Sequence, residues 1–60
     1  MNDPHQIHQL AGGDLDVWVD PGGAICLKVR TEFNDPVELA EREALALADL
    51  LIKLVEDLRK

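Results

Sequence analysis

Two runs in the first half of the chain alternate apolar residues with polar or aromatic ones. The apolar members of these runs are Leu15, Val17, Val19, Ile25, Leu27 and Val29. A period of two places successive side chains on opposite faces of a strand, so one face of each run is apolar. The sequence PGG between the runs is typical of a turn. The pattern therefore predicts a β-hairpin with one apolar face.

The length of the loop sets the register of this hairpin. A two-residue loop would place Asp16 opposite Leu27 and mix charged with apolar side chains on each face. A three-residue loop over residues 21–23, with Gly23 in the left-handed conformation, keeps apolar residues opposite one another. The pairs on the other face are then Trp18 with Cys26, Asp16 with Lys28 and Asp14 with Arg30. We expect this register, with ion pairs across the ladder that stabilise it by about 0.2–1 kcal/mol each.

The last third of the chain has the period of an amphipathic helix. Its apolar seam repeats at spacings of three and four and comprises Ala44, Leu47, Leu51, Leu54 and Leu58, widened by Ala40, Ala48 and Val55. Acidic residues lie four positions before basic ones, as in Asp49 and Lys53, which is typical of a solvated opposite face. The pattern predicts one long helix from Ala40 onward.

Two origins for this helix compete. Asp35 suits an N-cap with Pro36 at the first helical position. Alternatively, the segment before the helix is extended and the helix begins near Leu39. The strand-like alternation of Val37 and Leu39 favours the later start. Phe33, just before this segment, is expected to close the end of the core.

The predicted helix carries more apolar surface than one hairpin covers. At about 100° per residue, Leu45 and Ile52 lie on one flank of the seam and Leu50 lies on the other. A two-stranded ribbon is only about 10 Å wide, so it leaves these flanks uncovered. We expect a symmetric homodimer to cover them, the alternative being that the N-terminal arm folds over them. The expected interface comprises Leu45, Leu47, Leu50, Leu51, Ile52, Leu54, Val55, Leu58 and, on the hairpin, Trp18.

The predicted fold class is therefore α+β: a β-hairpin followed by one long amphipathic C-terminal helix (ββα), completed by homodimerisation. Residues 14–60 form the hairpin–helix domain, and residues 1–13 form an N-terminal arm that is either flexible or a short helix. Asp3 suits an N-cap, Pro4 suits the first helical position, and Gly12 and Gly13 would end such a helix. A helix this short is marginal in water.

Composition and charge narrow the classes of partner. Hydrophobic residues make up 47% of the chain and charged residues 30%, as in a folded protein rather than a disordered one. The net charge of −6 is opposite in sign to the surfaces that bind nucleic acid or anionic membranes. No apolar run approaches the roughly 20 residues of a membrane span, and the polar first residues lack the features of a signal peptide. With Cys26 as the single cysteine, we expect a cytoplasmic protein.

Two groups of residues suggest chemistry, and each has a structural alternative. Trp18, Cys26 and Lys28 share one face of the hairpin and would form a reactive patch if the thiol were activated. No activating base lies nearby, so we favour Trp18 as a cover for this face and Lys28 as a cross-strand ion-pair partner. His5 and His8 have a helical spacing that suits a shared metal ion, but no third strong ligand follows at a motif spacing. We expect surface histidines, no metal, no cofactor and no enzyme activity.

The order of these elements resembles that of short uncharacterised bacterial proteins in which a β-hairpin precedes one long helix. The resemblance rests on the DPGG turn, the strand that ends in LKVRT, the segment DPVEL and the helix rich in Ala, Leu and Glu. It covers about residues 16–58. The chain departs from the pattern at Ala40, where a Ser or Thr helix cap is expected. The resemblance implies a fold and no activity.

The chain is thus predicted to be a small cytoplasmic dimerisation or protein-interaction module without catalytic chemistry. Its expected partners are a second copy and an unidentified protein. An alternative is an antitoxin-like or regulatory partner protein that associates with DNA. Only Lys28 and Arg30 supply positive charge on the ribbon, opposed by Asp14 and Asp16, which disfavours DNA.

Overall fold

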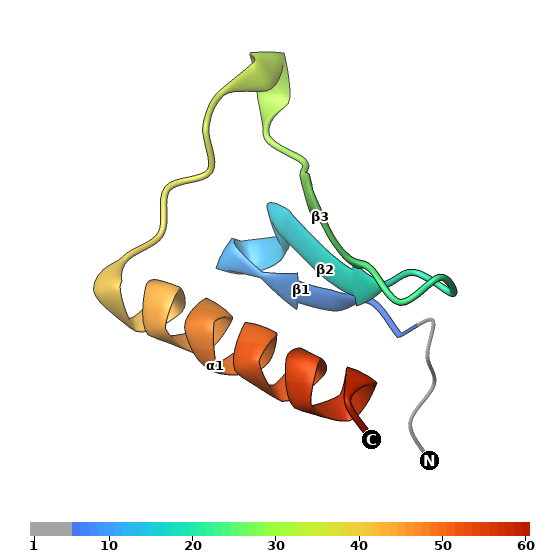
Figure 1. Ribbon diagram of the computed structural model, residues 1–60. Helices are drawn as coiled ribbons and strands as arrows, with labels where there is room; N and C mark the ends of the chain where they lie inside the picture. The colour runs from blue at the N-terminus through green and yellow to red at the C-terminus, as the bar shows by residue number, and fades with distance from the viewer. Residues whose placement is uncertain (1–5) are drawn as a thin grey trace.

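The sheet of this protein has three strands, and one long helix lies against it (Figure 1). The computed structural model describes residues 6–60. Its elements are β1 (His8–Leu10), the 3₁₀ helix η1 (Ala11–Gly13), β2 (Leu15–Val19), β3 (Ile25–Val29), the 3₁₀ helix η2 (Glu32–Asn34) and α1 (Glu41–Leu58). The sheet is antiparallel in the order β1-β2-β3. The predicted α+β class, a β-hairpin followed by one C-terminal helix, is confirmed.

The hairpin of β2 and β3 has the predicted three-residue loop. Gly23 has a φ of +95°, in the left-handed region that favours glycine. The Gly23 amide donates to the Asp20 carbonyl at 2.8 Å, and the Asp20 amide donates to the Ala24 carbonyl at 2.8 Å. The register pairs Leu15 with Val29, Asp16 with Lys28, Val17 with Leu27, Trp18 with Cys26 and Val19 with Ile25. The predicted register is therefore confirmed.

The N-terminal arm, predicted to be either flexible or a short helix, contains a strand at residues 8–10, which form β1. This strand pairs antiparallel with β2, with His8 opposite Val17 and Leu10 opposite Leu15. A short helix has little stability of its own, whereas a strand here hydrogen-bonds to the free edge of β2. The expected helix start at Asp3 and Pro4 lies outside the described residues.

Helix α1 begins at Glu41, with Ala40 as its N-cap. The Ala40 amide donates to the Glu43 carboxylate at 3.1 Å, which is half of a capping box. Alanine has no side-chain acceptor with which to make the other half. The later of the two predicted origins is confirmed, since residues 35–40 are not helical.

The core lies between α1 and the facing side of the sheet. Leu15, Val17 and Leu54 are buried, and partly buried side chains surround them. These are Leu10, Val19, Ile25, Val37, Leu47, Leu50 and Leu51. The central strand β2 thus supplies the middle of the core, and one side of α1 covers it.

The connector from β3 to α1 turns sharply at η2, and here a prediction is wrong. Phe33, expected to close the core, is 89% exposed. It has a φ of +55°, followed by Asn34 at +59°, so the backbone forms a tight left-handed turn that carries the ring away from the core. The Thr31 hydroxyl donates to the Asp35 carbonyl across this turn. Val37 packs against the core in place of the ring.

Candidate interaction surface

Helix α1 carries two apolar stripes, of which its own sheet covers one. Leu47, Leu50, Leu51 and Leu54 pack against the sheet. A second stripe, at spacings of three, four and three, comprises Leu45, Ala48, Ile52 and Val55. Leu45 is 62% exposed, Ile52 is 58% exposed and Val55 is 38% exposed. We call these four residues the exposed stripe.

The residues of the predicted interface therefore separate into two groups. Leu47, Leu50, Leu51 and Leu54 serve the core of the chain itself, while Leu45, Ile52 and Val55 lie on the exposed stripe. Leu58 is 42% exposed near the end of the helix. Trp18 is half-buried on β2, on the face of the sheet opposite α1. The structure thus divides the helical residues of the prediction between the core and the exposed side of α1, and Trp18 lies apart from both groups.

Strand β3 forms one edge of the sheet, and no strand among residues 6–60 pairs with its outer side. The hydrogen bonds from Asp20 to Ala24 and from Arg30 to Asp14 show that the even-numbered residues of this segment bond to β2. Since the direction alternates along an antiparallel strand, Ile25, Leu27 and Val29 direct their amides and carbonyls outward. The predicted register of the hairpin already implied this free edge.

The α1-facing side of β3 is also incompletely covered. Leu27 is 49% exposed and Val29 is 46% exposed, whereas Val17 on the central strand is fully buried. Helix α1 therefore covers the middle of the sheet better than its β3 side. Half-buried aliphatic side chains next to a free strand edge are typical of a surface that receives another chain.

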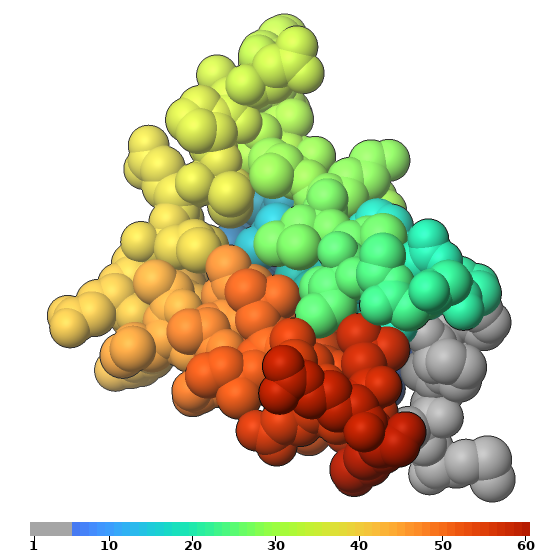
Figure 2. Space-filling view, in the orientation of Figure 1, coloured from blue at the N-terminus to red at the C-terminus, as the bar shows by residue number. Residues whose placement is uncertain are grey.

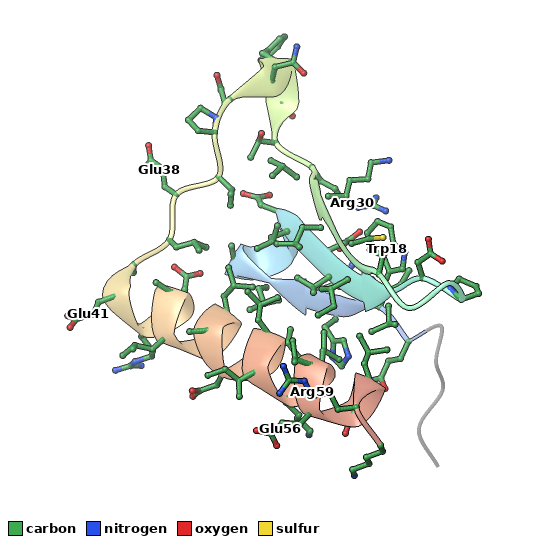
Figure 3. All side chains as sticks on the ribbon, viewed as in Figure 1. Trp18, Arg30, Glu38, Glu41, Glu56 and Arg59 are labelled. Carbon is green, nitrogen blue, oxygen red and sulfur yellow. The ribbon has the colours of Figure 1, made fainter. Side chains whose placement is uncertain are left out.

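The exposed stripe and β3 lie on the same side of the molecule. In Figure 2, atoms of β3 and of α1 are next to each other on the face toward the viewer. Arg59, which follows the stripe by four residues, extends across the viewer-facing side of α1 in Figure 3. At about 100° per residue, Arg59 lies within the same sector of the helix as the stripe. The exposed stripe of α1 therefore faces the same side of the molecule as β3.

The opposite face of the sheet holds a buried carboxylate. Asp16 is 2% exposed, and its Oδ2 accepts a hydrogen bond from Arg30 Nε at 2.5 Å. The other oxygen, Oδ1, is buried without a hydrogen-bond partner. The predicted ion pairs of Asp16 with Lys28 and of Asp14 with Arg30 are wrong, because Arg30 reaches diagonally to Asp16. The guanidinium is less strongly hydrated than an ammonium group and so suits a buried carboxylate better.

Among residues 6–60, the side chains considered for a reactive or metal site do not come together in one place. Cys26 is a free, half-buried thiol opposite Trp18 in the ladder. His8 lies on β1, and His5 lies outside the described residues. Within residues 6–60 there is no group of three or more His, Cys, Asp or Glu side chains placed to hold a metal ion. The described helices include none with the length and apolar character needed to cross a bilayer.

Comparison with protein-family models, with curated proteins and with solved structures finds no match for this chain.

Proposed function

We propose that this chain is a small protein-interaction module that works by self-association and has no catalytic chemistry of its own. The observation that carries this proposal is the exposed stripe of α1, with Leu45 and Ile52 more than half exposed. Full burial of one such side chain stabilises an assembly by about 1.5–3 kcal/mol. That is a large gain for a chain of 60 residues, whose own core is small.

The free thiol and the charge of the chain complete this proposal. We place the module in the cytoplasm, where a lone cysteine such as Cys26 stays reduced. The net charge of −6 keeps the assembly soluble and disfavours acidic partners such as nucleic acid. Self-association then depends on apolar contact rather than on overall charge attraction.

Replacing Ile52 by Asp tests this proposal. Ile52 lies on the exposed stripe, and the new carboxylate would have to be desolvated in any interface that covers it. Light scattering coupled to gel filtration should give a dimer mass for the unaltered chain and a monomer mass for Ile52→Asp at the same low micromolar concentration.

The matched control is Lys53→Asp, which introduces the same residue at the neighbouring exposed position on the other side of α1. It should leave the mass unchanged, and circular dichroism should show both variants folded. An unchanged dimer mass for folded Ile52→Asp would remove the exposed stripe from the interface.

A further inference from the structure

We propose that the partner of this surface is a second copy of the chain, bound about a two-fold axis that pairs α1 with α1 and β3 with β3, each antiparallel. This inference rests on the proposed self-association and specifies its geometry. The exposed stripe, the charged residues at its two ends and the free edge of β3 each point to the same symmetry.

The spacings between the stripe residues and their flanking charged residues are the same in both directions along the helix. Glu41, Leu45, Ala48, Ile52, Val55 and Arg59 follow one another at spacings of four, three, four, three and four. Two antiparallel copies aligned about position 50 therefore place every member of this series opposite another member. The alternation of three and four also suits the shallow crossing of side-by-side helices.

This alignment matches residues by size. Ala48, the one small residue of the stripe, lies opposite Ile52 of the second copy. Leu45 lies opposite Val55 of the second copy in the same way. A small side chain opposite a large one lets two helices approach closely, as knobs fit into holes. The two-fold axis repeats both contacts, so that of Ala48 with Ile52 and that of Leu45 with Val55 each occur twice in the dimer.

The alignment also matches residues by charge. Glu41 at the start of α1 lies opposite Arg59 of the second copy, at its end. Among residues 6–60 the ion pairs are Arg30 with Asp16 and Lys60 with Asp57, so neither Glu41 nor Arg59 has an ion-pair partner within that part of the chain. Parallel helices would instead place Glu41 near Glu41 and Arg59 near Arg59. Charge therefore favours the antiparallel arrangement and sets its register.

The free edge of β3 has the same two-fold property. Pairing Leu27 with Leu27 of the second copy places Ile25 opposite Val29 on either side. All three outward-facing residues then exchange their amide and carbonyl hydrogen bonds with the other copy. The side chains that meet on the α1 side are all aliphatic, and Lys28 meets Cys26 on the other side.

Neighbouring registers of β3 are less favourable. An axis at Lys28 would place two ammonium groups directly opposite each other, which destabilises a ladder. An axis at Cys26 would pair Val29 with Gly23, whose φ of +95° belongs to the hairpin loop. Each of these registers loses one hydrogen-bonded pair of residues at the end of the strand. The register centred on Leu27 therefore forms the largest number of hydrogen-bonded pairs along this edge.

The two pairings require the same direction of the two-fold axis. A two-fold axis perpendicular to the sheet at the edge of β3 extends the sheet and keeps both α1 helices on the same face, antiparallel to each other. Atoms of β3 lie on the viewer-facing side in Figure 2, and so does Arg59 in Figure 3, which shares the helical sector of the stripe. A standard interface covers about 800 Å² per partner, about one-sixth of the 4849 Å² surface of this chain. A strand edge alone is too narrow for that area, so the helices have to take part.

Charge reversal tests the helix pairing. Glu41→Arg and Arg59→Glu each place like charges opposite one another twice per dimer, and each should raise the dimer Kd about tenfold. The double variant restores both pairs with their charges exchanged, so its Kd should return to within about threefold of the original. Sedimentation equilibrium measures all four constants.

The double variant also separates pairing from helix stability. Both reversals place the unfavourable charge at an end of α1, so an effect that acted only through the helix dipole would be largest in the double variant. The control Arg42→Glu makes the same charge change at an exposed position off the stripe and should leave Kd unchanged. A double variant that dimerises no better than the single variants would overturn the antiparallel register.

Cross-linking tests the strand pairing. In the register centred on Leu27, Lys28→Cys places a new thiol directly opposite Cys26 of the second copy, at a non-hydrogen-bonded position where a disulfide fits. Mild oxidation should convert the variant to a covalent dimer whose disulfide, mapped by mass spectrometry, joins positions 26 and 28 of different chains. Lys53→Cys supplies a second thiol away from the interface as the control and should not give this product.

The outcomes distinguish this geometry from self-association itself. A Lys28→Cys variant that dimerises without the cross-link would overturn the strand pairing, and a Cys26–Cys26 cross-link in the unaltered chain would overturn its register. In both cases the proposed self-association would stand. A chain that remains monomeric would remove both proposals.

Discussion

At the scale of single residues, the far face of the sheet shows what a strand register predicts and what it does not. The register predicted that Asp16 faces Lys28, and the backbone places it there. Side-chain length and hydration then decide the ion pair, because Arg30 reaches Asp16 along the diagonal of the ladder. Sequence alternation contains no information on that choice, nor on how deeply Asp16 is buried.

This choice leads to a stability prediction. Arg30→Gln removes the cation from a carboxylate that is 2% exposed, so the free energy of unfolding should fall by about 1–2 kcal/mol, a value that allows for the solvent exposure of the Arg30 side chain. Lys28→Gln, on the same strand and face, should change it by less than about 0.5 kcal/mol. Urea unfolding at one protein concentration measures both. Equal losses in the two variants would contradict the assigned ion pair.

At the scale of elements, the hairpin and α1 were predictable and β1 was not. Alternation over five residues and a PGG loop define β2 and β3, and a long seam defines α1. Strand β1 has only three residues, and its pairing with β2 is a tertiary contact that no local pattern contains. Gly12 and Gly13, which suited the end of a helix, lie instead in the turn between β1 and β2. The one sequence feature that indicated this pairing is the presence of Leu10 and Leu15 on either side of the turn, where they lie opposite each other.

This turn gives a prediction for β1. Gly13 has a φ of +99°, a conformation that costs a residue with a Cβ atom about 1–2 kcal/mol. Gly13→Ala should therefore lower the free energy of unfolding by that amount. Gly22→Ala is the control, because Gly22 lacks a positive φ and its added Cβ would lie 3.3 Å from a single side-chain atom, Asp20 Oδ1, which accepts a hydrogen bond from the Gly22 amide. A stability loss no larger for Gly13→Ala than for Gly22→Ala, in thermal unfolding, would contradict this account of the turn.

At the scale of the whole molecule, one surface stands out. The sheet covers only part of the apolar circumference of α1, and α1 covers only part of the sheet, so aliphatic side chains of both remain in contact with water. The sequence predicted this surplus on the flank of Leu45 and Ile52. It did not show that Leu50 belongs to the core, because only the position of the sheet decides which flank is covered.

The mass of the unaltered chain in solution tests the central claim most directly. Sedimentation equilibrium over a range from high nanomolar to high micromolar concentration should show reversible association, with twice the 6.7 kDa mass of one chain reached at low micromolar concentration. A folded chain that keeps the mass of 6.7 kDa throughout this range would contradict the claim that a second copy covers the exposed stripe.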